Sequence, residues 1–311
     1  MKLAMVFPGQ GSQSVGMLNG YADIPAVRDV LAEASDVLKQ DVAKLIAEGP
    51  AAELNSTVNT QPVMVTVGFA AYRAWQELGG QTPAVVAGHS LGEYTALVVA
   101  GAMTFADALP LVRLRAQAMQ SAVPLGEGGM AALLGLDDEG VRAACAEASQ
   151  GQVVEAVNFN APGQVVIAGH AKAVERAIVA AKARGAKRAV ALPVSAPFHS
   201  SLMAPAAARL GEALKNVNIK APAIPVIHNV DAAGRADAAG IADALVRQAD
   251  HAVLWSDCVR KMAAEGVTHV FECGPGKVLG PLSKRIVAGL EGLALADRAG
   301  IDAGLVLFGK V

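Results

Sequence analysis

Residues 88 to 92 read GHSLG, so that Ser90 stands midway between Gly88 and Gly92. An apolar run precedes this stretch and a segment with helical character follows it. A strand, a G-x-S-x-G turn and a helix form the context in which such a serine is a nucleophile, because the turn strains the backbone and exposes the hydroxyl. The amide of Leu91 would then point from a helix N-terminus at the place where an oxyanion forms. The alternative is that Ser90 only caps the helix.

A nucleophilic serine needs a base, usually a histidine. The chain offers His89, His170, His199, His228, His251 and His269. We expect His89 to be a buried packing residue, and His228, which closes an apolar strand, can line a cleft. His199 follows a strand end in a proline-bearing loop, which is an ordinary place for a catalytic base. The other three lie beside helix starts or strand ends, where capping and surface roles are commonest.

Alternating apolar runs and helical periodicity define the elements that must position Ser90 and His199. A buried strand is expected at Leu3 to Phe7, running into a loop with Gly9, Gln10 and Gly11. The expected helices occupy residues 25–48, 61–78, 92–100 and 105–121. After the loop of His199 we expect a helix to Asn216, a strand in IPVIHNV, one helix at about 240–263 and a strand in THVFECGPG.

Residues 125 to 194 show a different pattern of expected elements, in which strand-like and helical stretches follow the order β-α-β-β-α-β. This order is that of a ferredoxin-like unit, which can fold as a layer of its own. We therefore predict an α/β fold in two parts. Residues 1–124 and 195–311 form a large catalytic part with a parallel sheet, and residues 125–194 form a small inserted part.

Composition narrows the class of protein. The chain has 311 residues and a formal net charge of −2, which predicts no binding to nucleic acid or to an anionic membrane. The apolar run from Ile286 to Phe308 carries too many charges for an ordinary spanning helix. Cys145, Cys258 and Cys273 are too widely spaced for a disulfide framework or a zinc site, and they favour a reducing cytoplasm.

Seven stretches together resemble the malonyl-CoA:acyl carrier protein transacylases of bacterial fatty acid synthesis and the acyltransferase domains of polyketide synthases. They are FPGQGSQ (7–13), GHSLGEY (88–94), LVRLRAQAMQ (111–120), NFNAPGQVVIAG (158–169), PVSAPFHSSLM (193–203), PVIHNV (225–230) and FECGPGKVL (271–279). They occur in the family's order and cover nearly the whole chain. The resemblance implies an α/β-hydrolase-like large part with a ferredoxin-like insert, which agrees with the division read from periodicity.

The resemblance also implies a role for individual residues. Ser90 corresponds to the nucleophile and His199 to its base, while the Gln10 amide joins that of Leu91 in the oxyanion hole. Arg115 corresponds to the arginine that binds the free carboxylate of the substrate. The remaining matches are Gln248, whose carbonyl orients the histidine, and Asn160 and Met119, which line the acyl pocket. No cofactor or metal is implied.

Phe198 departs from many stand-alone bacterial members, which have a small polar residue before the histidine. A phenylalanine there resembles malonyl-selective polyketide acyltransferase domains, in which it narrows the pocket at the α-carbon. The residue therefore favours malonyl over methylmalonyl, and it leaves open whether the carrier protein serves fatty acid or polyketide synthesis.

The G-x-S-x-G turn does not distinguish a transferase from a serine hydrolase or thioesterase. Arg115 favours transfer of malonyl, because acetyl would leave its guanidinium unpaired. The expected partners are malonyl-CoA and a holo acyl carrier protein, which is acidic. Two basic clusters are candidates for receiving it: Lys182, Arg184, Lys187 and Arg188 in the insert, and Lys284 with Arg285 near the C-terminus. With no heptad seam in the sequence, we expect a monomer.

Overall fold

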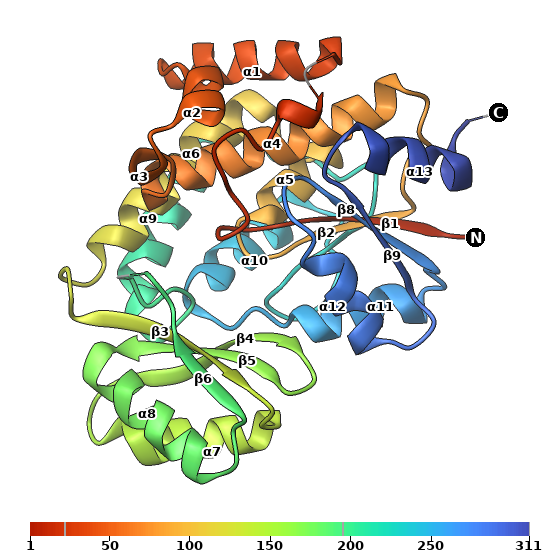
Figure 1. Cartoon of the computed structure of the whole chain (residues 1–311). Coiled ribbons are helices and arrows are strands. Elements are labelled where there is room, and N and C mark those ends of the chain that lie inside the picture. Colours follow the sequence, from red (N-terminus) through yellow and green to blue (C-terminus); the bar gives the residue numbers. More distant parts are fainter. Residues whose placement is uncertain (22, 195, 311) are drawn as a thin grey trace.

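Two β-sheets organise the chain, and helices pack on both faces of the larger one (Figure 1). The computed structural model describes residues 1–21, 23–194 and 196–310. The larger sheet is parallel throughout, with the strand order β7-β2-β1-β8-β9. Its strands are β1 (Leu3–Phe7), β2 (Val85–Gly88), β7 (Val226–Ile227), β8 (His269–Cys273) and β9 (Glu291–Leu295). The predicted α/β class with a parallel sheet is confirmed.

The central strand β1 is buried on both faces, as its unbroken apolar sequence indicates. Leu3, Met5 and Phe7 belong to one hydrophobic cluster, whereas Ala4 and Val6 belong to another. Side chains alternate across a strand, so one cluster lies on each face of the sheet. The first cluster includes residues of the helices α1 (Pro25–Leu38), α4 (Thr57–Glu77) and α6 (Phe105–Ser121), and the second those of α11 (Trp255–Ala264) and α12 (Leu279–Ile286).

The large part contains further helices. They are α2 (Val42–Glu48), α3 (Ala51–Leu54), α5 (Gly92–Val99), α9 (Ala204–Leu214), α10 (Ala238–Asp250) and α13 (Arg298–Phe308), with 3-10 turns η1 (Asn19–Tyr21) and η2 (Ser201–Met203). The helix expected at 25–48 is interrupted, because Lys39 adopts a left-handed backbone with φ 51° and Asp41 caps α2. No helix within the described ranges is long and apolar enough to cross a membrane.

The smaller sheet is antiparallel, with the order β4-β5-β3-β6, and two helices cover its outer face (Figure 1). Its elements are β3 (Gly128–Leu134), α7 (Asp138–Ser149), β4 (Val154–Ala161), β5 (Gln164–His170), α8 (Ala171–Ala183) and β6 (Arg188–Ala191). This is the predicted ferredoxin-like arrangement. The domain boundaries at residues 125 and 194 stay a prediction, and Ser195 and Val311 lie outside the described residues.

The prediction of a single helix at about 240–263 is wrong, because α10 ends at Asp250 and α11 begins at Trp255. Two of the four residues between them hydrogen-bond to β4 of the smaller sheet and to the segment that follows β7. Val253 donates its N–H to Val157 O at 2.8 Å and accepts from Phe159 N at 3.0 Å, and Leu254 N donates to Asn229 O at 2.9 Å. These tertiary hydrogen bonds take the backbone groups that a continuous helix would use, and they join β4 to the large part.

Candidate active site

Ser90 lies between β2 and α5 in a left-handed conformation, with φ 51°. The turn is this tight because strand and helix almost touch at the two flanking glycines. A Cβ on Gly88 would stand 1.8 Å from the carbonyl carbon of Gly92, and a Cβ on Gly92 would stand 2.1 Å from Phe7 O. Only glycine fits at both positions, so the spacing of the motif follows from packing.

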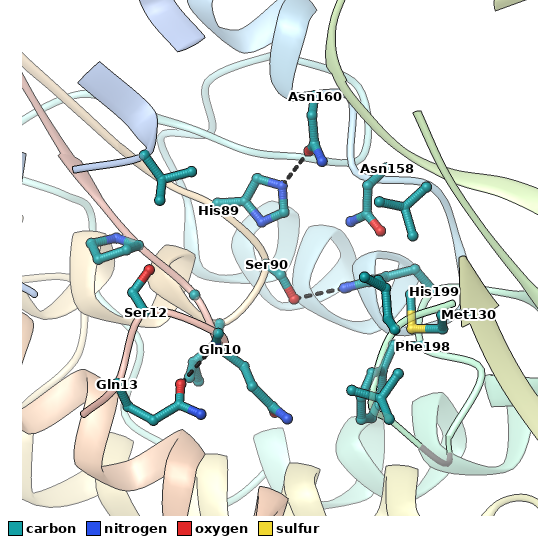
Figure 2. Close-up of a pocket in the computed structure, with 18 of the residues that line it drawn as sticks. Gln10, Ser12, Gln13, His89, Ser90, Met130, Asn158, Asn160, Phe198 and His199 are labelled. Carbon is teal, nitrogen blue, oxygen red and sulfur yellow. Dashed lines mark hydrogen bonds between the residues drawn. The ribbon is translucent and has the colours of Figure 1, made fainter. Parts of the chain in front are cut away.

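The serine and His199 form a hydrogen-bonded pair, 2.6 Å apart from Oγ to Nε2 (Figure 2). On the other side of the ring, Nδ1 lies 2.7 Å from the main-chain oxygen of Gln248. A carbonyl only accepts, so Nδ1 carries the proton, and Nε2 is left with the lone pair that accepts from the serine hydroxyl. The pair therefore has the tautomer that a base acting on Ser90 requires.

His199 is buried, with 4% of its surface exposed. Burial and, secondly, the positive charge of Arg115 lower the pKa of His199 to about 3. The imidazole is therefore neutral over the whole physiological range. It is ready to take a proton, and a negative charge placed near Arg115 would make the protonated form less costly.

Arg115 reaches this site from α6 and is only 2% exposed. Its guanidinium donates to Gln61 Oε1 at 2.8 Å, to Gln248 Oε1 at 3.0 Å and to Ser90 Oγ at 3.3 Å. It also lies over the ring of Tyr94, with 5.5 Å between Cζ and the ring centroid. All of these partners are neutral. A buried arginine without a carboxylate in direct contact is suited to binding an anion that enters from outside.

A pocket of about 610 Å³ opens onto Ser90, His199 and Arg115. The predicted residues Gln10, Leu91, Met119, Asn160 and Phe198 also line this pocket. Among the residues that the structure describes, the backbone amides of Gln10 and Leu91 have no acceptor. Two free amide donors beside a nucleophilic hydroxyl can stabilise an oxyanion.

His89 differs from the expectation of a buried packing residue. It is half-buried on the pocket wall, with Nε2 2.7 Å from Asn160 Oδ1, and Figure 2 shows its ring turned to Asn160 while Ser90 faces His199. His228, considered for the cleft, is fully buried and does not line this pocket. Of the remaining histidines, His170 accepts from Val153 N and His251 pairs with Asp250.

Three residues around the site were not singled out from the sequence: Gln61, Glu93 and Asn229. Gln61 binds Arg115 directly. Asn229 Oδ1 accepts from Ser90 N at 2.7 Å, and its Nδ2 donates to Gly88 O at 2.8 Å. Glu93 and Asn229 lie within the stretches GHSLGEY and PVIHNV. Nothing in either stretch indicates that Glu93 contacts the segment after β7 or that Asn229 contacts the turn of Ser90.

The two basic clusters lie in different surroundings. Arg285 NH1 donates to Gln164 Oε1 at 2.8 Å, and Gln164 lines the pocket. Arg184, in contrast, pairs with Glu147 of α7, on the helical layer that faces away from the large sheet (Figure 1). Within the described ranges, no three His, Cys, Asp or Glu side chains are grouped as a metal site would require.

Comparison with known proteins places this geometry in a family. Residues 4–280 match the acyl transferase domain. The malonyl CoA-acyl carrier protein transacylase of Salmonella typhimurium is 54% identical over 305 residues, which are 98% of this chain and 99% of that protein. The crystal structure of the acyl-carrier-protein S-malonyltransferase of Burkholderia pseudomallei is 64% identical with a TM-score of 0.97, covering 98% of this chain and all of its own.

A further solved structure is that of a malonyl-transacylase in complex with its type II polyketide synthase acyl carrier protein in the holo form. It is 49% identical with a TM-score of 0.97, and the match covers 99% of this chain and 100% of that one. These similarities extend over nearly the whole sequence. The chain belongs to the acyl transferase domain family.

Proposed function

We propose that the chain transfers the malonyl group of malonyl-CoA to the phosphopantetheine thiol of a holo acyl carrier protein. The observation that carries this proposal is the buried guanidinium of Arg115, which lies 3.3 Å from the hydroxyl of Ser90 in the same pocket. A malonyl thioester has a carbonyl to be attacked and a free carboxylate a few bonds away. The Ser90 hydroxyl attacks the carbonyl, and the Arg115 guanidinium binds the carboxylate.

Acylation begins when His199 Nε2 takes the proton of Ser90 as Oγ attacks the thioester carbonyl. The amides of Gln10 and Leu91 donate to the oxygen that becomes negative. The Nδ1–H of His199 continues to donate to Gln248 O, which stabilises the imidazolium in the same orientation. Collapse of the tetrahedral species breaks the C–S bond, and the proton passes from His199 to the departing CoA thiolate.

Transfer repeats these steps in reverse order with a new thiol. The phosphopantetheine thiol loses its proton to His199 and attacks the malonyl-serine ester, and the proton then returns to Ser90 Oγ. Met119, Asn160 and Phe198 shape the acyl pocket, and Phe198 limits the space at the α-carbon. The product supplies extender units for fatty acid or polyketide synthesis.

A serine hydrolase or thioesterase would use the same dyad and release free malonate. This alternative is less well supported, because such enzymes normally orient the histidine with a carboxylate, and here Nδ1 donates to the main-chain oxygen of Gln248. A carboxylate would raise the basicity of the imidazole further. A simple esterase also has no use for a buried arginine beside its nucleophile.

We further propose that the reaction uses no metal or cofactor, since a serine, a histidine and two amides supply nucleophile, base and oxyanion donors. The protein acts as a cytoplasmic monomer, and its three cysteines are free thiols. The acidic carrier protein docks at Lys284 and Arg285 of α12 rather than at the insert cluster, because Arg285 contacts a residue of the pocket wall. Charge complementarity of this kind raises the rate of encounter.

The covalent intermediate is directly measurable. Mixing the protein with malonyl-CoA alone should add the mass of one malonyl group, and holo acyl carrier protein should remove it. Ser90→Ala should form no adduct, whereas the control Ser149→Ala, on the outer helix α7, should behave like the parent. Steady release of malonate without a thiol acceptor would favour a hydrolase instead.

Replacing Arg115 should abolish the preference for malonyl over acetyl. The lost charge-assisted hydrogen bonds correspond to roughly 2–4 kcal/mol, or a 30- to 1000-fold fall in the ratio of the two kcat/KM values. The variant to compare is Arg115→Ala, measured with malonyl-CoA and acetyl-CoA. Arg113→Ala is the matched control, because Arg113 lies on the same helix but donates to Leu38 O and to Gln40. Unchanged selectivity in Arg115→Ala would remove it from the site.

The depressed pKa of His199 predicts an unusual pH profile for acylation. A group with its pKa lowered stays unprotonated as the pH falls, so kcat/KM for malonyl-CoA should stay flat from pH 8 to 5. An ordinary histidine with a pKa of about 6.5 would lose about 30-fold by pH 5. Single-turnover rates in non-interacting buffers test this, and an acidic limb near pH 6.5 would contradict the effect of burial on His199.

The docking proposal predicts different effects on two acceptors. Starting from malonylated enzyme, Arg285→Glu should raise the KM for holo acyl carrier protein roughly tenfold and leave transfer to free pantetheine unchanged. Arg184→Glu, which reverses a charge on the outer helical layer, is the control and should change neither. An equal effect of the two variants on the carrier protein would refute the choice of α12.

A further inference from the structure

A fully buried carboxylate lies directly behind the site. Glu93, in the first turn of α5, has none of its surface exposed and is not part of the pocket wall. Its Oε1 lies 2.7 Å from His228 Nδ1. Its Oε2 accepts from Asn229 N and from Gln248 Nε2, both at 2.9 Å. The carboxylate therefore holds one residue after β7 and one in α10 against the turn of the nucleophile.

Both partners of Oε2 contact the nucleophile. Asn229 Oδ1 accepts from Ser90 N at 2.7 Å, and Gln248 Nε2 donates to Ser90 O at 2.9 Å. The two main-chain groups of Ser90 are thus fixed in the strained left-handed conformation that directs Oγ into the pocket. Each of the residues that fix them is itself bound to Glu93.

Gln248 connects the same carboxylate to the base and to the cation. Its main-chain oxygen accepts from His199 Nδ1 at 2.7 Å, and its side-chain Oε1 accepts from Arg115 at 3.0 Å. Glu93 binds the amide nitrogen of this side chain, so it selects which end of the amide faces Arg115. If the Gln248 amide were rotated by about 180°, its N–H groups would face the guanidinium. Arg115 would then lose the acceptor Oε1, and an unsatisfied donor in a buried site costs free energy.

Glu93 also acts on Arg115 electrostatically. His228 Nδ1 lies against Glu93 Oε1, while His228 Nε2 has no partner among the described residues. The Gln248 amide joins Glu93 to Arg115, since its Nε2 donates to Glu93 Oε2 and its Oε1 accepts from the guanidinium. Burial lowers the pKa of the Arg115 guanidinium, and the charge of Glu93 acts in the opposite direction.

We propose that Glu93 is a positioning residue for the reaction, which acts through Asn229 and Gln248 to hold Ser90, His199 and Arg115 in one arrangement. It touches neither substrate nor reacting atoms. Its contribution to the rate comes from geometry, because a small displacement of a nucleophile or base reduces the rate far more than it reduces binding. The choice of malonyl-CoA as the substrate for the test rests on the proposed function.

The test is Glu93→Gln, which keeps the size of the side chain but turns one acceptor into a donor facing the donors around it. Single-turnover malonylation, monitored by intact mass, gives two separate quantities: the rate constant and the end-point fraction of malonylated protein. The rate constant should fall at least about tenfold, while the end-point fraction of malonylated protein should equal that of the parent. The KM for malonyl-CoA should change less than about threefold. A residue that only stabilises the fold would lower the end-point and leave the rate constant unchanged, which would overturn the proposal.

Glu272→Gln is the matched control. Glu272 is the other fully buried carboxylate of the described chain, and it accepts from Gly280 N at 3.1 Å at the start of α12. Both variants should lose stability in urea, but only Glu93→Gln should lose rate. Glu93→Asp keeps the charge but withdraws it by one methylene, so its rate constant should lie between those of the parent and Glu93→Gln. If Glu93→Gln does not fold, an Asp variant as fast as the parent overturns the proposal.

A serine-directed sulfonyl fluoride makes the result independent of the substrate. Labelling of Ser90 should slow in Glu93→Gln by a factor similar to that for malonylation. A parent that is labelled by the reagent but never malonylated would refute the proposed function and leave the positioning role testable. A parent and Glu93→Gln labelled at the same rate would refute the positioning role alone.

Discussion

The left-handed backbone of Ser90 is the constraint on which the rest of the site depends. Strand β2 and helix α5 approach so closely at Gly88 and Gly92 that a Cβ would clash at either position, and Ser90 between them has a φ of 51°. The strain is maintained because both main-chain groups of Ser90 are bound, its N–H by Asn229 and its carbonyl by Gln248. The hydroxyl is thereby directed at His199, and the amide of Leu91 is left free for an oxyanion.

The electrostatics of the site follow from burying a cation beside a neutral base. Burial and the charge of Arg115 lower the pKa of His199. Among the described residues, the hydrogen-bond partners of Arg115 are neutral, and the amide of Gln248 bonds to both its guanidinium and the carboxylate of Glu93. A substrate carboxylate would complete this arrangement, since it would neutralise the guanidinium and ease protonation of the histidine. Recognition of the acyl group and activation of the base are then two effects of the same charge.

The sequence predicted the fold class and several of the residues that line the pocket, because those features depend on local pattern and on the family's motifs. The buried strand at Leu3 to Phe7, the turn at Ser90 and the helix of Arg115 each follow from apolar runs, glycine spacing and periodicity. The helix expected across residues 251–254 was wrong, because Val253 and Leu254 form backbone hydrogen bonds with β4 and Asn229 that no local pattern shows. His89 was expected in the core and instead forms part of the pocket wall with Asn160.

The sequence alone therefore determined which chemical groups the chain contains: a serine in a tight turn, a histidine in a loop and an arginine on a helix. It also showed the motifs of a known family in that family's order. Tertiary structure decided how those groups are connected. The tautomer of His199 depends on Gln248, 49 residues away, and the backbone of Ser90 on Asn229, 139 residues away. The buried Glu93 network depends on contacts over more than 130 residues. Hydrogen bonds of this kind depend on distance in space, and only the folded chain brings such distant residues within reach.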